Sequence, residues 1–281
     1  MSDQAVTVSY LRSKKKYPSV WCPGCSLGTI MGALLRAVDM LEIPRDDIVF
    51  ASGIGCTGRM PVYTDFNTFH GTHGRALAFA TGIKMAKPRL EVILAMGDGD
   101  STAIGGNHFI HTCRRNLDLT AIVVNNNIYG MTGGQFSPTT PLNHFASTAP
   151  HGSIDPPFDI CNLAQGSGAT YVARTTSYHV RPMQKIIADA IAHKGFSVVE
   201  IMSHCYTTYG RRNGFKDPVE MMKQEKENAV TLKSYEKKKE EDASYELEPG
   251  QFLTGVFVND KNRPEYSKVY ADLSARLREE Q

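Results

Sequence analysis

The sequence predicts an α/β fold in which a mostly parallel sheet is flanked by helices. Three short, apolar stretches rich in β-branched residues, 47–51, 90–96 and 120–124, alternate with segments that suit helices. Alternation of this kind is typical of parallel sheets, in which ligands gather at the carboxyl ends of the strands. Each stretch runs into a turn rich in glycine, aspartate or asparagine. We therefore expect a ligand site at that edge of the sheet.

The elements of the first half follow in order. Residues 23–41 open with a glycine-rich turn and then, from Leu27, place apolar side chains at positions i, i+3 and i+4, which predicts an amphipathic helix; the strand 47–51 comes directly after it. Small and apolar residues predict a helix over 73–87, which Pro88 ends. The strand 90–96, a helix through 107–115 and the strand 120–124 then form a strand–helix–strand unit.

The second half begins with an irregular, proline-containing stretch over 137–157, and a loop of that length is usually functional. A helix over 160–166, a strand over 171–174, a helix over 180–193 and a strand over 197–202 follow. Charged residues dominate 221–248, and a polar helix is expected over 266–279. We interpret 1–215 as the catalytic domain and 216–281 as a charged, peripheral C-terminal extension that packs on a partner or on its own domain.

Composition narrows the class of protein. A chain of 281 residues that is 41% hydrophobic buries one large core, and its formal charge of +2 is spread over the whole length, so neither nucleic acid nor a membrane surface is an expected partner. No apolar core follows the lysines at 14–16, so no signal peptide is expected, and no window reaches the roughly 18–20 apolar residues of a membrane span. We expect a cytoplasmic protein, whose six cysteines favour metal ligation or catalysis over disulfides.

The most informative spacing joins Asp98, in a Gly-Asp-Gly turn after one strand, to Asn126, 28 positions later, after the next strand. Mg²⁺ favours a carboxylate, an amide or carbonyl oxygen and phosphate oxygens, and the carbonyl of Ile128 offers a third protein ligand. Glycine backbone N–H groups leave room for a phosphate. The alternative is that both are ordinary strand-to-helix turns. The paired spacing resembles the signature of enzymes that use thiamine diphosphate.

A second glycine-rich turn, Gly53-x-Gly55-x-x-Gly58, matches the fingerprint of dinucleotide-binding proteins and follows a predicted strand. Pro61 interrupts the helix that the fingerprint requires. No second strand ending in an acidic residue follows at the expected distance. The pattern therefore disfavours a nicotinamide cofactor.

Four of the cysteines form a candidate metal site. Cys22 and Cys25, spaced Cys-x-x-Cys, suit a redox dithiol, half of a zinc site or two ligands of an iron–sulfur cluster. Cys56 and Cys205 each follow a predicted strand at the same edge of the sheet, so that four thiolates converge beside the Gly-Asp-Gly turn. The two remaining cysteines lie within predicted helices and are expected to be buried core residues.

Taken together, about the first 210 residues resemble the β subunit of 2-oxoacid:ferredoxin oxidoreductases. The matching motifs are Trp21-Cys22-Pro23-Gly24-Cys25, Gly53-Ile54-Gly55-Cys56, His73-Gly74-Arg75, Gly97-Asp98-Gly99-Asp100, Ile104-Gly105-Gly106-Asn107-His108, Asn126-Asn127-Ile128-Tyr129-Gly130-Met131-Thr132-Gly133-Gly134-Gln135 and His204-Cys205.

The resemblance implies a thiamine diphosphate-binding fold with Mg²⁺ on Asp98, Asn126 and the Ile128 carbonyl. It implies one 4Fe-4S cluster, whose ligands would be Cys22, Cys25, Cys56 and Cys205. The residues expected to contact the cofactor are Ile54, Gly55, Cys56, Thr57, His73, Gly97, Gly99, Asp100, Tyr129, Gly130 and Met131. His73 is also a candidate catalytic residue.

Arg59 is expected to contact the substrate, because members of this family carry a basic residue three positions after the third cysteine. The Cys-x-x-Arg form resembles the enzymes that act on 2-oxoglutarate, and an arginine binds a carboxylate through two parallel N–H···O bonds. The alternative is that Arg59 merely attracts any 2-oxoacid. Pyruvate and branched-chain 2-oxoacids are therefore alternative substrates.

By resemblance, the chain catalyses oxidative decarboxylation of a 2-oxoacid with coenzyme A to acyl-CoA and CO₂, and electrons pass through the cluster to ferredoxin. The glutamate that activates thiamine comes from the partner chain in this family, so we expect a heteromer with an α subunit. Two alternatives are a non-oxidative thiamine-dependent decarboxylase, whose cysteines bind zinc or nothing, and an electron-transfer subunit without catalytic activity.

Overall fold

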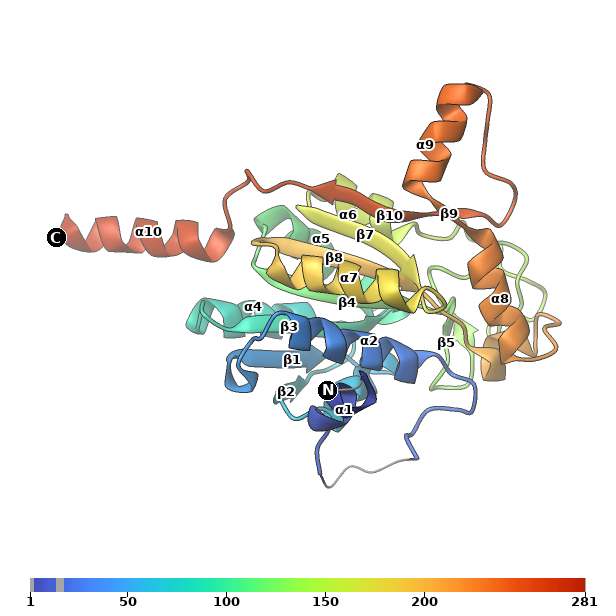
Figure 1. The fold of residues 1–281 in the computed structure, drawn as a ribbon, viewed down its shortest axis with the longest axis horizontal. Helices are drawn as coiled ribbons and strands as arrows, with labels where there is room; N and C mark the ends of the chain where they lie inside the picture. The colour runs from blue at the N-terminus through green and yellow to red at the C-terminus, as the bar shows by residue number, and fades with distance from the viewer. Residues whose placement is uncertain (1–2, 14–17, 281) are drawn as a thin grey trace.

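The structure is a computed structural model that describes residues 3–13 and 18–280 (Figure 1). The lysines at 14–16, which entered the argument about a signal peptide, lie outside the described residues. Within the described chain no helix is long and apolar enough to cross a membrane.

The helices and strands alternate over most of the chain. The helices are α1 (Asp3–Ser9), α2 (Leu27–Met40), α3 (Met60–Tyr63), α4 (Ala76–Ala86), α5 (Gly106–Arg115), α6 (Ile160–Gly166), α7 (Val180–Ala192), α8 (Pro218–Asn228), α9 (Leu232–Glu241) and α10 (Tyr266–Glu279), with shorter helical turns η1 (Arg45–Asp47), η2 (Thr57–Arg59), η3 (Asp100–Ile104) and η4 (Tyr206–Gly210). The strands are β1 (Ile48–Ser52), β2 (Asn67–His70), β3 (Glu91–Gly97), β4 (Leu119–Asn125), β5 (Ile128–Tyr129), β6 (Gln135–Phe136), β7 (Tyr171–Thr176), β8 (Phe196–Met202), β9 (Ala229–Thr231) and β10 (Phe252–Asn259).

An eight-stranded, mostly parallel sheet with the order β2-β1-β3-β4-β8-β7-β10-β9 organises the molecule, which confirms the predicted fold class. Strands β2, β1, β3, β4, β8 and β7 run parallel to one another, and β10 pairs antiparallel to β7. The chain therefore leaves β1, β3, β4 and β8 at the same edge. The predicted turns and Cys205 all follow these strand ends.

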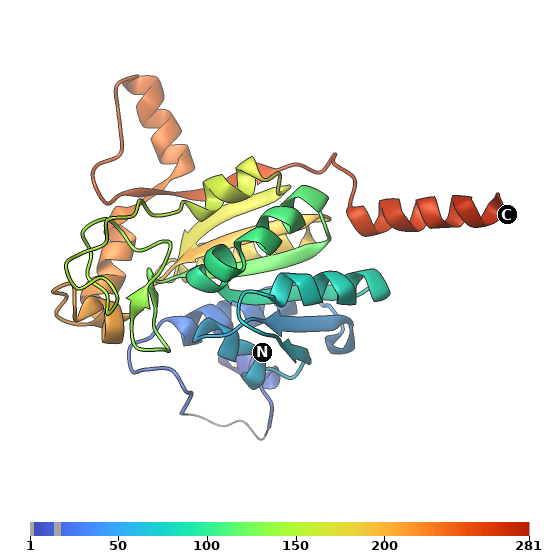
Figure 2. The same ribbon diagram turned by 180° about the vertical axis from the view of Figure 1, so that it is seen from behind.

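Helices cover both faces of the sheet. Helices α2 and α7 lie on the face seen in Figure 1, where their apolar sides pack with Phe50, Ile122 and Val199. Helices α4, α5 and α6 cover the opposite face, seen in Figure 2, and pack with Leu94 and other strand residues. Every residue of β4 is buried, because both faces are covered.

Helix α2 begins after the glycine-rich turn that the sequence predicts, whereas helix α4 begins later than predicted. Helix α2 begins at Leu27, because Gly24 adopts a φ of +81° and the N–H of Cys25 donates to the Cys22 carbonyl in a tight turn. Helix α4 begins at Ala76, after Gly74 at a φ of +69°. The helix that follows Gly58 is α3, only four residues long, which is far shorter than a dinucleotide-binding fold requires.

The C-terminal segment is built into the edge of the sheet. The strand β10, which the sequence analysis missed, pairs with β7, and β9 pairs with β10. Helix α8 packs beside the turn η4, whereas α9 and α10 project away from the body of the molecule (Figure 1). Of the residues after 215, helices α9 and α10 are therefore peripheral, whereas strands β9 and β10 are part of the main sheet.

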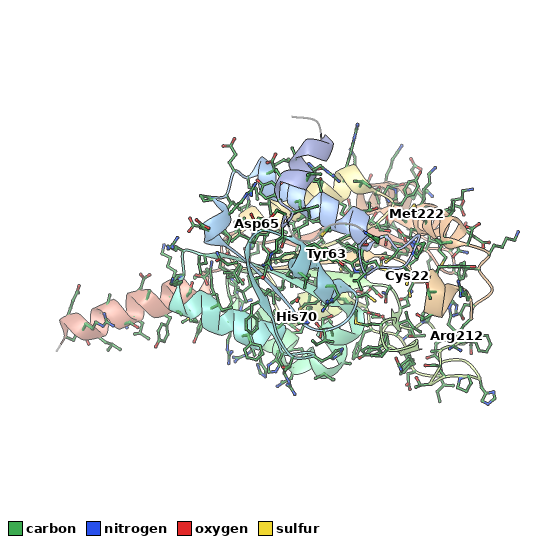
Figure 3. All side chains as sticks on the ribbon, turned by 90° about the horizontal axis from the view of Figure 1, so that it is seen from below. Cys22, Tyr63, Asp65, His70, Arg212 and Met222 are labelled. Carbon is green, nitrogen blue, oxygen red and sulfur yellow. The ribbon has the colours of Figure 1, made fainter. Side chains whose placement is uncertain are left out.

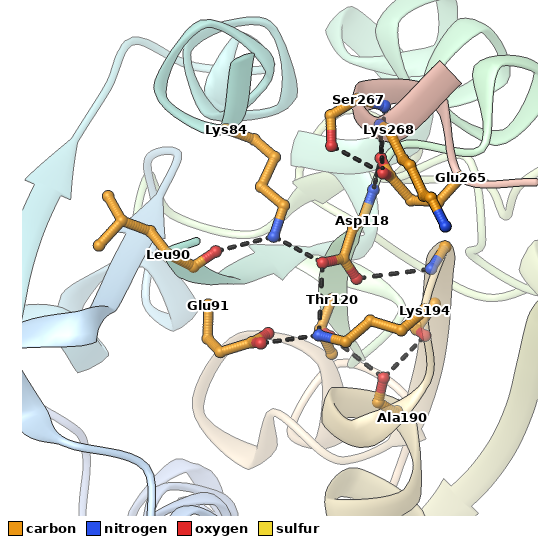
Figure 4. Close-up of polar contacts among 12 residues, drawn as sticks. Lys84, Leu90, Glu91, Asp118, Thr120, Ala190, Lys194, Glu265, Ser267 and Lys268 are labelled. Carbon is orange, nitrogen blue, oxygen red and sulfur yellow. Dashed lines mark hydrogen bonds and ion pairs between the residues drawn. The ribbon is translucent and has the colours of Figure 1, made fainter. Parts of the chain in front are cut away.

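One buried and one exposed lysine form ion pairs where the strands begin, at the opposite edge of the sheet (Figure 4). The Lys84 ammonium, which is only 1% exposed, lies 2.6 Å from the Asp118 carboxylate and donates to the Leu90 carbonyl. Lys194 pairs with Glu91 at 2.8 Å. The backbone N–H of Asp118 donates to Glu265, which fastens the start of α10 to β4.

Candidate functional site

A cavity of about 60 Å³ lies where the chain leaves β1, β3 and β4. The structure brings all of the predicted cofactor-binding and magnesium-binding residues to its wall. These residues are Ile54, Gly55, Cys56, Thr57, His73, Gly97, Asp98, Gly99, Asp100, Asn126, Ile128, Tyr129, Gly130 and Met131, and Thr132 joins them.

Asp98 is the buried carboxylate of this cavity, with 3% of its surface exposed. Its Oδ2 atom accepts hydrogen bonds from the hydroxyl groups of Ser137, at 2.6 Å, and Thr139, at 2.5 Å. Burial raises the pKa of Asp98, while these two hydrogen bonds oppose the rise. Both hydroxyls use the same oxygen, so the other oxygen of Asp98 remains available to a cation. Sequence reasoning missed Ser137 and Thr139, because nothing in the long loop's composition marks these two hydroxyls.

The Asn125–Asn127 turn presents the amide of Asn126. The Oδ1 atom of Asn125 accepts the N–H of Asn127, which has a left-handed φ of +61°, and Oδ1 of Asn126 accepts the N–H of Ile128 at 3.3 Å. An amide oxygen has two lone pairs, so Asn126 can still bind a cation. The side-chain N–H of Asn125 donates to Glu200 at 2.8 Å, which fixes the turn against β8.

Gly99 forms a close-packed part of the cavity. A Cβ atom at this position would lie 2.3 Å from Cζ of Tyr129, so only glycine fits beneath the ring. The Tyr129 hydroxyl donates to the Gly99 carbonyl at 3.1 Å. Burial, followed by the charges of Asp98 and Asp100, raises the pKa of Tyr129 to about 12, so this phenol stays a hydrogen-bond donor at neutral pH.

The Asp100 carboxylate binds neighbouring loops. Its Oδ1 accepts the N–H groups of Gly74, at 2.8 Å, and Ile54, at 3.4 Å, while a Cβ atom at Gly53 would lie 2.0 Å from its Oδ2. His73, whose side chain is 29% exposed, places Nδ1 3.8 Å from Asp100. This Nδ1 is buried without a hydrogen-bond partner among the described residues, which leaves it available to a ligand.

A second cavity, of about 240 Å³, is lined by all four predicted cluster cysteines: Cys22, Cys25, Cys56 and Cys205. All six cysteines of the chain are free thiols, and the remaining two, Cys113 and Cys161, are buried in the core as expected. Figure 3 shows Cys22 from below, at the end of the molecule that also carries Arg212 and Met222.

The electrostatics of this second cavity favour a positive centre. Burial, with a smaller contribution from neighbouring thiols such as Cys205, raises the pKa of Cys25 to about 12 and that of Cys56 to about 11. Metal ligation requires thiolates, so a bound metal centre must supply the positive charge that offsets this cost. The indole N–H of Trp21 donates to the Cys56 carbonyl at 2.8 Å and fixes the backbone of that cysteine.

The two cavities share a wall. Cys56, Asn126, Gly130 and Met131 line both of them. A Cβ atom at Gly130 would lie 3.2 Å from the sulfur of Cys205 and 3.9 Å from that of Cys56. A group in the first cavity therefore lies beside Cys56 and is separated from Cys205 by little more than Gly130.

His204, which the sequence analysis named only as part of the His204-Cys205 motif, also belongs to this site. It lines the thiol cavity and is 3% exposed. Burial by itself lowers the pKa of His204, but its hydrogen bonds to Glu225 and the Gly24 carbonyl, together with the charge of Glu225, outweigh burial and raise that pKa.

Arg59 lies at the end of η2 and lines neither cavity. Arg59 is two residues further along the chain than Thr57, and Thr57 does line the first cavity. Its role as a substrate contact stays a prediction.

The fold and the paired turns define a thiamine diphosphate-binding domain, and the comparisons agree. Residues 50–201 match the family described as thiamine pyrophosphate enzyme, C-terminal TPP binding domain. This match covers the strands β3, β4, β7 and β8, the Gly-Asp-Gly turn and the Asn125–Asn127 turn.

Relatives narrow the class to one family. The chain is 45% identical over 273 residues to the 2-oxoglutarate synthase subunit KorB of Methanocaldococcus jannaschii, covering 97% of this chain and 98% of the relative. It is 52% identical over 225 residues to the subunit of the same name from Archaeoglobus fulgidus, covering 80% and 82%. The chain belongs to the β-subunit family of the 2-oxoacid:ferredoxin oxidoreductases.

A solved structure extends the likeness to three dimensions. The 2-oxoglutarate:ferredoxin oxidoreductase from Magnetococcus marinus, described with 2-oxoglutarate, coenzyme A and succinyl-CoA bound, matches with a TM-score of 0.83 at 31% identity. The match covers 96% of this chain and 90% of that chain. The fold is therefore shared along nearly the whole length, including the C-terminal segment.

Proposed function

We propose that this chain is the catalytic β subunit of a 2-oxoglutarate:ferredoxin oxidoreductase, which forms succinyl-CoA and CO₂ from 2-oxoglutarate and coenzyme A and passes electrons to ferredoxin. The observation that carries the proposal is the shared wall between two ligand sets. A carboxylate and an amide suited to a metal–diphosphate group lie beside four convergent thiols. Two-electron oxidation of a decarboxylated 2-oxoacid needs such an adjoining electron acceptor.

The first cavity fits the metal–diphosphate end of the cofactor. Asp98, Asn126 and the Ile128 carbonyl are the proposed Mg²⁺ ligands, and the backbones of Gly97, Gly99 and Gly130 line the same cavity, where a diphosphate would lie. When bound, thiamine diphosphate supplies the electron sink for decarboxylation. The chain's own residues orient that end: Ser137 and Thr139 fix the Asp98 carboxylate, and the buried Nδ1 of His73 is available for a hydrogen bond to a ligand.

The second cavity fits an iron–sulfur cluster on four thiolates. Four cysteines also suit zinc, but zinc has no redox chemistry and would serve no purpose beside an oxidising site. Relatives of this chain are named 2-oxoacid:ferredoxin oxidoreductases, and ferredoxin is the corresponding electron acceptor. We therefore propose a 4Fe-4S cluster on Cys22, Cys25, Cys56 and Cys205.

Arg59 supports 2-oxoglutarate as the substrate. Its side chain is half-buried on η2, close to the Cys56 ligand and the Thr57 wall of the first cavity. A substrate with a second carboxylate can use the two parallel donors of a guanidinium. The M. jannaschii and A. fulgidus relatives are named for 2-oxoglutarate, and the solved M. marinus enzyme holds it.

The size of the first cavity supports a partner chain. Pockets that hold a whole small molecule have about 300–1,000 Å³, far more than the about 60 Å³ found here. This chain therefore builds part of the cofactor site, and we propose that an α subunit covers the rest. Met131, which is 46% exposed at the rim, is available for such a contact.

The test is to purify the chain anaerobically with its α subunit and measure ferredoxin reduction in the presence of coenzyme A. We expect 2-oxoglutarate to be used in strong preference to pyruvate at matched concentrations. The Arg59→Lys variant should lose most of that preference, because lysine cannot donate two parallel hydrogen bonds. The Arg75→Lys variant, whose arginine lies at the surface beside His108, serves as the matched control.

Each contrary result has a distinct meaning. If pyruvate is preferred, the substrate proposal fails while the family assignment holds. If the protein binds thiamine diphosphate but is colourless and contains zinc instead of iron, a non-oxidative decarboxylase is correct. Turnover by the isolated chain would refute the need for an α subunit.

A further inference from the structure

Three distant segments meet behind the candidate cluster ligands: the Cys22–Cys25 loop, the residues after β8, and helix α8 of the C-terminal segment. The Gly24 carbonyl, in the middle of that loop, accepts a hydrogen bond from Nε2 of His204 at 2.9 Å. Since a carbonyl oxygen only accepts, Nε2 carries a proton. The loop with two cysteines is thus joined to the residue beside Cys205, although the two partners are 180 positions apart.

The other ring nitrogen of His204 binds helix α8. Its Nδ1 lies 2.6 Å from Oε1 of Glu225, and the two residues are only 3% and 7% exposed. The second carboxylate oxygen of Glu225 accepts from the Ser177 hydroxyl at 2.7 Å and the Tyr178 N–H at 3.1 Å. Both oxygens of Glu225 are therefore engaged, and the imidazole is held from both sides.

Helix α8 also packs directly on the cluster segments. A Cβ atom at Gly24 would lie 2.5 Å from the ring of Pro218, the first residue of α8. Met221 is 6% exposed in an apolar cluster with Cys205, Tyr206 and Tyr209. Helix α8 therefore contacts both segments by packing, independently of the hydrogen bonds.

We propose that Glu225 and His204 are positioning residues for the iron–sulfur cluster, and that helix α8 completes the shell around its ligands. The proposal rests on the proposed function, because it presumes that the four cysteines hold a cluster. Residues in a second shell orient metal ligands, and hydrogen bonds around the sulfurs set cluster stability and potential. The charged segment after residue 215 thereby gains a defined role within this chain.

The test compares variants of the full chain, produced with the α subunit, by the rate at which an iron chelator bleaches the cluster's visible absorbance. In Glu225→Gln, the single side-chain carbonyl oxygen cannot accept from both His204 and the Ser177–Tyr178 pair. We expect bleaching about 10- to 100-fold faster than in the wild type. The electron paramagnetic resonance spectrum of the reduced cluster should change as well. Glu227→Gln, on the exposed side of the same helix, should behave as the wild type.

A second comparison separates positioning from general stability. The single variant His204→Gln and the double variant with Glu225→Gln should bleach at similar rates. The reason is that Glu225 acts on the cluster ligands only through His204, so its loss adds nothing once His204 is replaced. Affinity for Mg²⁺ and thiamine diphosphate, measured by titration, should stay within about twofold of the wild type in both. Should Glu225→Gln not fold, Ser177→Ala removes one donor to Glu225 and is expected to shift bleaching in the same direction.

The contrary outcomes are distinct. Bleaching at the wild-type rate in Glu225→Gln, or in Ser177→Ala if that variant replaces it, overturns the positioning role while leaving the proposed function intact. A parallel loss of cofactor affinity also overturns it, because the residues would then stabilise the fold in general. Wild-type protein that contains no iron or sulfide overturns both proposals.

Discussion

Asp98 is held by hydroxyl groups that lie 39 and 41 positions further along the chain. Ser137 and Thr139 belong to an irregular loop, and their hydrogen bonds carry that loop to the end of β3. The carboxylate is thereby oriented before any cation arrives. When a buried carboxylate loses such a donor, one of its lone pairs is left without a hydrogen bond, which lowers the stability of the folded state.

The Thr139→Val variant should therefore be less stable, since valine has the same shape but no hydroxyl. We expect the free energy of unfolding to fall by about 1–3 kcal/mol and affinity for Mg²⁺ to fall as well. Urea unfolding and a Mg²⁺ titration measure the two effects. Ser274→Ala, which removes an exposed hydroxyl on α10, should change stability by less than about 0.5 kcal/mol. Equal stability of Thr139→Val and wild type would contradict this account.

Glu200 connects the Asn125–Asn127 turn to a buried ion pair. Its carboxylate accepts hydrogen bonds from the Asn125 amide and from the Cys161 thiol, the latter at 3.3 Å. The same carboxylate forms an ion pair with Arg174 at 2.7 Å, and Arg174 also pairs with Asp159. The three groups Asp159, Cys161 and Glu200 lie close enough to hold a metal ion. Arg174 already places a positive charge between the two carboxylates, so this cluster is an ion-pair network.

Replacing Glu200 with glutamine should remove the charge that balances Arg174 in the interior. We expect a loss of about 3–5 kcal/mol in the free energy of unfolding, the usual cost of breaking a buried ion pair from one side. Weaker binding of Mg²⁺ and thiamine diphosphate should accompany it, because Asn125 loses its anchor. Denaturant unfolding and cofactor titration test both parts, with the exposed Glu240→Gln on α9 as control. A stable variant with normal cofactor affinity would show that the turn needs no such anchor.

At the scale of elements, apolar patterns predicted the buried strands and the helices that cover them. Strands β3 and β4 are apolar along their length because both faces are covered, and this local signal was sufficient. Strand β10 was missed because only part of its surface is buried at the edge of the sheet. Its pairing with β7 depends on a long-range contact that no local pattern encodes.

The same distinction applies to the site. Glycine, aspartate and asparagine at strand ends identified the turns, because backbone geometry and ligand chemistry constrain those positions locally. Ser137, Thr139 and Glu225 contact the site from segments chosen by tertiary packing, so no spacing identified them. The Asp100 carboxylate was expected near the diphosphate, and its hydrogen bonds to the N–H groups of Gly74 and Ile54 became visible only in three dimensions.

Helix α10 depends on Glu265, which caps its N-terminus. The carboxylate accepts the N–H groups of Ser267 and Lys268 and also that of Asp118 in the core. Burial by itself raises the pKa of Glu265, but these bonds and the Ser267 hydroxyl outweigh it and hold the pKa below its ordinary value of 4.5. Because the folded pKa is lowered, this stabilisation is present above about pH 4.5 and is lost as the pH falls through the lowered pKa.

We expect Glu265→Gln to reduce stability by about 1 kcal/mol at pH 7, as is usual for a lost helix cap. The difference from wild type should shrink as the pH falls below 4.5, because the wild-type carboxyl then loses its charge too. Unfolding measured at several pH values, with protection of α10 amides from hydrogen exchange, tests this. The exposed Glu246→Gln serves as control. A difference that persists unchanged at low pH would exclude the charged cap as its origin.

At the scale of the whole molecule, the two proposed ligand sets adjoin but use different atoms: oxygen atoms for Mg²⁺ and cysteine sulfurs for the cluster. If both proposals hold, removing Mg²⁺ with EDTA should release thiamine diphosphate and leave the brown colour of the cluster in place. Absorbance and cofactor analysis after gel filtration measure the two. Adding Mg²⁺ and cofactor back should restore activity. Simultaneous loss of cluster and cofactor would mean that the two cavities form one structural unit.

The joining of Gly24 to His204 and Glu225 has a consequence for the order of assembly during synthesis. The Cys22–Cys25 loop is synthesised well before the helix α8 (Pro218–Asn228) that supports it. At about 5–20 residues per second, the intervening chain takes roughly 10–40 seconds to make. The contacts between this loop, His204 and Glu225 can therefore form only once α8 has been synthesised, and the β7–β10 edge of the sheet forms later still.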